Sequence, residues 1–182
     1  MKITSFISFM LLVIASINSV SCSKSASSSA TPSGTKTTWN DGTNQTADST
    51  IAILYTSSGA RVMDIFVFKG EMKDPAGITF GISPLEMHIS PKSGVQTVKA
   101  APNNAWLTFF DYHNGNINLP VDVYDGATGN FNLTACDTTK VTITGTFDFT
   151  GQYYNLLTRA YDASKTKAIT NGNLVVDKIY RQ

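Results

Sequence analysis

The two histidines of the chain each stand two positions from a carboxylate, in the segments LEMHIS and FFDYHN. Alternate side chains of a strand point to the same face, so Glu86 would lie beside His88 and Asp111 beside His113. Two such pairs on neighbouring strands could hold a zinc-like ion. The simpler interpretation places both histidines at strand ends that run into solvated loops. We therefore expect no metal and no cofactor.

Asp64 interrupts the apolar segment VMDIFVF, on the face that it shares with Val62, Phe66 and Phe68. A carboxylate among apolar side chains needs partners, commonly Arg, Tyr or backbone N–H groups. The pattern favours a structural, hydrogen-bonded Asp64 or a position at the rim of the sheet. The alternative is an Asp64 that contacts a ligand.

The familiar catalytic motifs are missing from the sequence. It contains no Gly-x-Ser-x-Gly, His-Glu-x-x-His, phosphate-binding loop or Cys-x-x-Cys. Cys136 is followed by an acid rather than accompanied by a base, which favours a small, partly buried side chain over a thiol nucleophile. We expect no catalytic residues and a non-enzymatic domain. The alternative function is a hydrolase or lyase that acts on an envelope or environmental polymer.

Aromatic residues and oxygen-rich turns offer two weaker binding hypotheses. Tryptophans and tyrosines could stack on sugars, although aromatic residues of β proteins more often lie in the core; the candidates are Trp39, Trp106, Tyr153, Tyr154 and Tyr161. The segments DGATGN and DYHNGN resemble calcium loops but lack the spacing of an EF-hand. Ordinary turn chemistry accounts for both segments.

From Trp39 onward, short β-branched and aromatic segments alternate with turn residues every 8 to 12 positions. VTITGTFDF, residues 141–149, alternates strictly and predicts a strand with one buried face. RVMDIFVF (61–68) and AWLTFFDYH (105–113) predict central strands covered on both faces. Further strands are expected at 50–56, 77–82, 94–100, 119–124, 129–136, 152–161 and 166–179, and no window predicts an amphipathic helix.

This pattern predicts an all-β fold in one domain. We expect a single antiparallel β-sandwich of jelly-roll type, and the alternative is a closed up-and-down β-barrel. A domain of this length can bury a substantial core without a disulfide.

The N-terminal residues predict export and a lipid anchor. Residues 1–21 combine Lys2, an apolar run and small residues, as a secretory signal peptide does. The following Cys22 resembles the cysteine of a relaxed bacterial lipobox, which would carry a thioether-linked diacylglyceryl group. The alternative is ordinary cleavage that leaves an unmodified cysteine. Residues 22–38 then form the lipidated cysteine and a flexible Ser/Thr-rich tether, and 39–182 the domain.

Charge and the residues after Cys22 bear on partners and location. Loss of residues 1–21 removes Lys2 from 14 basic residues, leaving 13 against 13 acidic ones. A neutral domain has no bulk electrostatic reason to bind nucleic acid, so we expect none. Expected partners are the membrane, through the lipid, and a glycan, a small ligand or an envelope protein. The absence of acidic residues in CSKSASSS favours the periplasmic face of the outer membrane.

Several segments together resemble an uncharacterised family of Bacteroidota lipoproteins. They are TTWNDG after the tether, GVQTVKAAPNNAWLTFFDY, TGNFNLTACDTTKVTITGTFDF and AITNGNLVVDKI. The resemblance covers most of residues 37–179, with departures at Asn132, Cys136 and Leu174. It implies an all-β lipoprotein domain and brings no catalytic residues. The triplets at 48–50 and 137–139 also resemble the short O-glycosylation acceptor of that phylum, with Ser49 and Thr138 as the modified residues.

Overall fold

The computed structural model describes residues 34–73, 77, 79–98, 105–113 and 121–182. Cys22, the predicted signal peptide and most of the predicted tether therefore lie outside the described residues. None of the helices in the described ranges is long and apolar enough to span a membrane.

The described chain is built almost entirely of strands, which confirms the all-β prediction. The strands are β1 (Thr38–Asn40), β2 (Asn44–Thr46), β3 (Ser49–Ser57), β4 (Ala60–Phe68), β5 (Glu71–Lys73), β6 (Thr79–Gly81), β7 (Leu85–Ile89), β8 (Gly94–Thr97), β9 (Ala105–Asp111), β10 (Asp122–Asp137), β11 (Thr142–Asn155), β12 (Ala160–Val175) and β13 (Lys178–Arg181).

One large sheet contains all of these strands except the β5–β6 hairpin. Its order is β13-β3-β4-β7-β9-β10-β11-β12-β1-β2, and β8 pairs with β10 beside β9. Every pairing is antiparallel apart from β13 with β3. Strands β3 to β12 follow one another almost in chain order, as a meander rather than the crossed connections of a jelly roll. The path is open at β13 and β2, so the sheet is not the closed barrel of the alternative prediction.

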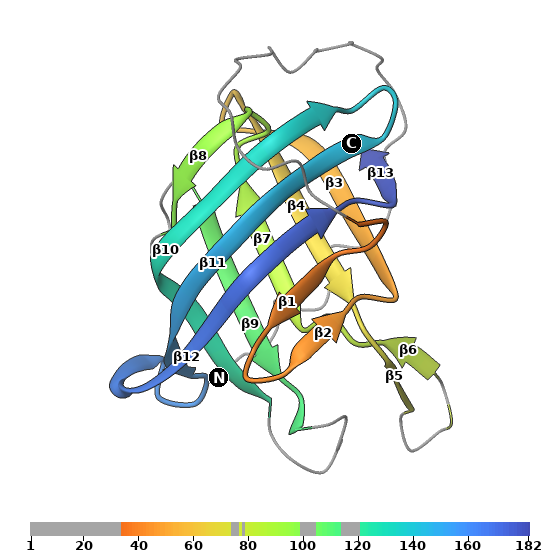
Figure 1. Cartoon of the computed structure of the whole chain (residues 1–182). Helices are drawn as coiled ribbons and strands as arrows, with labels where there is room; N and C mark the ends of the chain where they lie inside the picture. Colours follow the sequence, from red (N-terminus) through yellow and green to blue (C-terminus); the bar gives the residue numbers. More distant parts are fainter. Residues whose placement is uncertain (1–33, 74–76, 78, 99–104, 114–120) are drawn as a thin grey trace, which may run out of the picture.

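The sheet curls over so that β10, β11 and β12 lie in front of β3, β4, β7 and β9 (Figure 1). The side chains between these two halves form the sandwich core. Large core residues with under 2% of their surface exposed are Met63, Ile65, Leu85, Met87, Ile89, Leu107, Phe131, Leu133, Phe147, Ile143, Ile169 and Leu174. The opposite parity of each strand faces outward, as period-2 alternation requires.

Strand β11 has the one-sided burial that its sequence predicts. Ile143, Phe147 and Phe149 are buried, while Thr142 on the opposite parity is exposed. Val141, which the pattern places on the buried face, is instead 40% exposed and has a φ of 54° just before the strand begins. The alternation therefore holds only where the chain pairs with its neighbours.

The predicted turn at DGATGN is wrong, because these residues lie inside the long strand β10. The predicted strands 119–124 and 129–136 thus belong largely to one strand. Gly129 has a φ of 143°, and a Cβ atom there would lie 2.2 Å from the carbonyl oxygen of Asp148 on β11. This glycine permits close approach of two strands. Likewise, 152–161 is not one strand, since the turn between β11 and β12 interrupts it.

Candidate functional site

The side chains singled out in the sequence meet on the outer face of the sheet. Asp64 on β4 pairs in register with His88 on β7, and His88 pairs with Trp106 on β9. Their neighbours along each strand point into the core, so these three side chains form a row on the opposite surface. Trp106 is 36% exposed. The pairing places a carboxylate, an imidazole and an indole side by side.

Asp64 and His88 form a short hydrogen bond. His88 Nδ1 lies 2.6 Å from Asp64 Oδ1, and the hydroxyl of Tyr55 on β3 lies 3.5 Å from the same nitrogen. The imidazole N–H donates to the carboxylate in this arrangement. The Asp64 side chain keeps 28% of its surface exposed. The geometry therefore matches the structural, hydrogen-bonded Asp64, with His88 as its partner. Asp64 lies at the middle of β4 and not at the rim of the sheet, and ligand contact there stays a prediction.

Asp64 in this row contributes to raised pKa values of two neighbouring side chains, Tyr55 and Glu86. The pKa of Tyr55 is raised to about 12, first by burial, then by its hydrogen bond to Asp64 and by the charge of Asp64. The pKa of Glu86, which shares the outer face of β7, is raised by burial and next by the charge of Asp64. Elsewhere in the sheet, Tyr161 on β12 donates to Asp125 on β10 at 2.9 Å, and burial and this carboxylate raise the pKa of Tyr161 to about 12.

We expect Tyr55 and Tyr161 to ionise after the other tyrosines in a spectrophotometric titration of tyrosinate absorbance. The Asp64→Asn variant should move the late transition of Tyr55 down towards the ordinary tyrosine pKa of 10.0, leaving the part of the shift that burial causes. Asp148→Asn, at an exposed position of β11, should leave the titration unchanged. An identical curve for Asp64→Asn and wild type would contradict the interaction.

The raised pKa of Tyr55 determines how the stability of the fold changes with pH. The folded chain holds the Tyr55 proton more tightly than the unfolded chain does. The resulting stability is complete below roughly pH 10 and is lost as the pH rises through the folded pKa.

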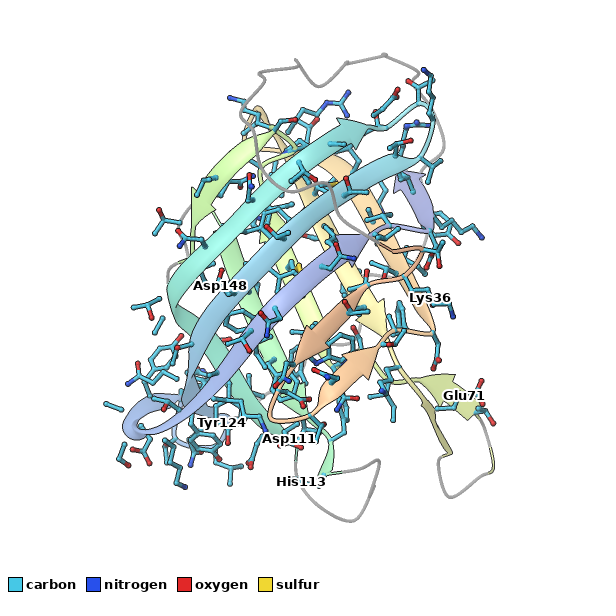
Figure 2. All side chains as sticks on the ribbon, viewed as in Figure 1. Lys36, Glu71, Asp111, His113, Tyr124 and Asp148 are labelled. Atoms are coloured by element: carbon cyan, nitrogen blue, oxygen red, sulfur yellow. The ribbon has the colours of Figure 1, made fainter. Side chains whose placement is uncertain are left out.

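The second histidine lies with carboxylates at one end of the sheet. His113 Nε2 is 3.4 Å from Asp122 and its Nδ1 is 3.9 Å from Asp111, and Lys167 Nζ is 3.7 Å from Asp111. Figure 2 shows Asp111 and His113 at this lower end. The predicted proximity of Asp111 and His113 is therefore found.

His88 is the penultimate residue of β7, next to the segment that follows the strand at Ser90, so its expected position near a strand end is confirmed. The strand β7 itself was not among the strands expected from the sequence. Strands β7 and β9 are neighbours, yet His88 faces Trp106 while Asp111 lies at the far end of β9. Within the described ranges, no group of three or more His, Cys, Asp or Glu residues is placed to hold a metal.

A recess of about 560 Å³ lies between β1, β2, β5 and the end of β9. Its size falls within the range of small-molecule sites. The apolar part of its wall consists of Ile82, Pro84, Phe109, Phe110 and Tyr112. Ile82 and Phe109 are largely buried, so this wall is supported by the core.

The polar part of the recess comes from the β1–β2 hairpin and the segment around β5. Asp41 Oδ1 accepts from Thr43 N at 3.3 Å and from Gln45 Nε2 at 3.2 Å. Asp48 Oδ2 accepts from Gly70 N at 2.7 Å. Lys69 Nζ donates to Gln45 Oε1. These contacts orient carboxylates, an amide and an ammonium group towards one space.

Trp39 lies at the base of the recess with an unpaired donor. Its side chain is 2% exposed, and its indole Nε1 is the buried side-chain polar atom without a hydrogen-bond partner in the described chain. Lys69 Nζ lies 5.9 Å from the centre of the indole ring. An unsatisfied buried donor costs about 1–3 kcal/mol, so a partner for this N–H would stabilise the site.

The modification candidates differ in accessibility. Ser49, the first residue of β3, is half-buried, whereas Thr138 is only 7% exposed. Ser49 is thus the more accessible acceptor, and glycosylation of either residue stays a prediction. Cys136 is 6% exposed and belongs to the core cluster, as expected for a small apolar side chain. Cys22, the other cysteine of the chain, lies outside the described residues.

The recess is the feature that sequence patterns missed. Gln45, Thr46 and Asp48 lie in a segment whose composition predicts a turn. Lys69 directly follows a predicted strand and belongs to no recognisable motif. Only the sheet brings them next to Trp39. Comparisons with protein-family models, with curated proteins and with solved structures find no match for this chain.

Proposed function

We propose that this chain is a lipid-anchored protein of the bacterial cell envelope whose β domain binds a small polar ligand in the recess beside Trp39. The recess is the observation that carries the binding role, because donors and acceptors from separate strands converge there on an apolar wall. The anchor rests on the small residues that precede Cys22.

Binding without catalysis is the function that this site supports best. The described lining contains no serine, cysteine or histidine. Asp41 and Asp48 accept hydrogen bonds from the backbone of neighbouring turns, so one oxygen of each is already used to hold the loops. The Asp64–His88 pair lies on the outer face of the sheet instead of in the recess. These side chains are suited to orient a ligand.

The anchor and the charge balance support a location at the outer membrane, on its periplasmic face. Acyl chains on Cys22 would hold the protein to the bilayer, at roughly 0.8 kcal/mol for each buried CH₂ group. The equal numbers of basic and acidic residues after position 21 give the domain itself no general attraction for anionic surfaces or nucleic acid.

Filling the recess tests the binding role. Thr46 is exposed and lines the recess, so Thr46→Trp should occupy it without disturbing the core. We would measure the Tm of the purified full-length chain with neutral saccharides, sugar phosphates, amino acids, nucleotides and spermidine. A ligand at ten times its Kd stabilises by about 1.4 kcal/mol, or roughly 3–6 °C. The Tm increase should disappear in Thr46→Trp.

The matched control is Thr158→Trp, which makes the same change at an exposed residue of the β11–β12 turn, outside the lining of the recess. It should respond as wild type does. The binding role is wrong if no compound raises the Tm, or if Thr46→Trp responds as strongly as wild type.

A further inference from the structure

We infer that the ligand of this recess is an uncharged, hydroxyl-rich molecule, namely a short saccharide. This inference rests on the proposed binding role. It follows from three properties of the lining: its charge, its unpaired donor and its apolar wall.

The charge of the recess disfavours anions. The carboxylates of Asp41, Asp48, Glu71 and Asp111 share the described lining with one lysine, Lys69, and Asp111 is also paired with Lys167 outside that lining. A phosphate or a carboxylate brought into this recess would meet repulsion from most of its charged neighbours. Figure 2 shows Glu71 on the β5–β6 hairpin and Asp111 at the end of the sheet, so the negative charge comes from two separate elements.

The unpaired donor disfavours a simple cation. The indole N–H of Trp39 lacks an acceptor, and an ammonium group or a metal ion supplies none. A hydroxyl group both accepts and donates, so it can accept from Trp39 and donate to a carboxylate such as Asp41. A ligand with several hydroxyl groups meets both needs at once.

Lys69 is the charged side chain that contacts Trp39 in the recess. The indole nitrogen is shielded from solvent, and the Lys69 ammonium group lies above the ring and is bonded to Gln45. A ligand hydroxyl that binds beside Trp39 would compete with Gln45 for the ammonium group of Lys69. Lys69 and Gln45 each regain a hydrogen bond if the ligand hydroxyls replace the contact between them, so the exchange leaves neither group unpaired.

The apolar wall fits the C–H face of a sugar ring. The half-buried side chains of Phe110 and Tyr112 supply carbon surface to the same lining as the carboxylates of Asp41 and Asp48. Saccharides combine an apolar face with a polar rim, and sites for such ligands pair a few directed polar groups with apolar walls. Trp39 therefore belongs to a sugar site as a hydrogen-bond donor at its base, and not as an exposed stacking platform.

The test uses Trp39 as its own reporter. The chain has two tryptophans, so the Trp106→Phe variant retains Trp39 as its only indole fluorophore. We would titrate this full-length variant with glucose, galactose, N-acetylglucosamine, maltose and cellobiose. Glucose 6-phosphate and spermidine represent the anionic and cationic classes. A saturable change in Trp39 emission is expected with at least one neutral saccharide, and none with the two charged probes.

Calorimetry on the reverse variant tests the role of the indole donor. Trp39→Phe keeps an aromatic ring but removes the N–H, and it should weaken saccharide binding about threefold to tenfold. Trp106→Phe is the control and should bind as wild type does. If Trp39→Phe does not fold, the emission titration of Trp106→Phe decides alone.

The outcomes separate this inference from the proposed function. Binding of glucose 6-phosphate or spermidine, lost in Thr46→Trp, would overturn the saccharide while keeping the recess as a binding site. Saccharide binding that leaves Trp39 emission and the Trp39→Phe affinity unchanged would place the sugar elsewhere and overturn the inference. Failure of every compound to bind would overturn both.

Discussion

Replacement of Phe147 with alanine is expected to lower the free energy of unfolding by about 3–5 kcal/mol. Phe147 is 2% exposed and lies at the centre of β11 between the two halves of the sheet. The backbone of β12 packs directly on its ring: a Cβ atom at Gly172 would lie 2.4 Å from Phe147 Cδ2. Because this contact is between a ring and a paired strand, the surroundings have little freedom to fill the space that alanine leaves.

Thr144→Ser provides the matched control on the same strand. Thr144 points to the outer face, and its hydroxyl lies 3.1 Å from that of Thr134 on β10. Serine keeps this hydroxyl and loses one half-exposed methyl group, so the change should stay within about 0.5 kcal/mol. Urea denaturation of both variants measures the difference. Similar losses for Phe147→Ala and Thr144→Ser would contradict one-sided burial of β11.

Replacement of Cys22 with alanine should abolish lipid labelling completely. The thiol of Cys22 is the acceptor of the proposed thioether, and alanine offers no nucleophile at that position. Metabolic labelling with a palmitate analogue, followed by membrane fractionation, measures the effect. Unprocessed precursor without label is expected. Equal label on wild type and Cys22→Ala would rule out the anchor.

Cys136→Ala is the control for this experiment, since it removes the other cysteine of the chain. It should keep the label. The pair of cysteines allows a second test, because a sulfur in a thioether cannot also join a disulfide. A Cys22–Cys136 bridge found by mass spectrometry in the exported protein would therefore also contradict the anchor.

Sequence periodicity predicted those parts of the fold in which burial follows strand parity. The buried face of β11 and the need of Asp64 for a partner both follow from alternation and from the cost of an unpaired carboxylate. The identity of that partner could not be predicted from alternation, because His88 meets Asp64 only through the register of β4 and β7. Register depends on contacts between strands, which one strand's sequence does not contain.

The length of β10 and the recess were missed for a related reason. Glycine favours turns locally, yet Gly126 and Gly129 lie within β10 because the neighbouring strands approach too closely for a side chain. In the same way, the sequence alone favours Trp39 as an ordinary core residue. Its unpaired N–H becomes a candidate binding group only because the fold places Lys69 and Asp41, from separate segments, in the same recess.

The parallel pairing of β13 with β3 constrains the order in which the sheet can be assembled. Thr50 N donates to Asp177 Oδ2 across 127 residues, and Ile51 to Leu54 pair with residues 178–181. Strand β3 emerges early from any translocation pore but keeps one unpaired edge until those late residues arrive. Such an edge is a template for wrong pairing between chains. Export of the chain, as proposed, would therefore require protection of β3 during transit, and slow release of the last strand should increase aggregation before it affects the finished fold.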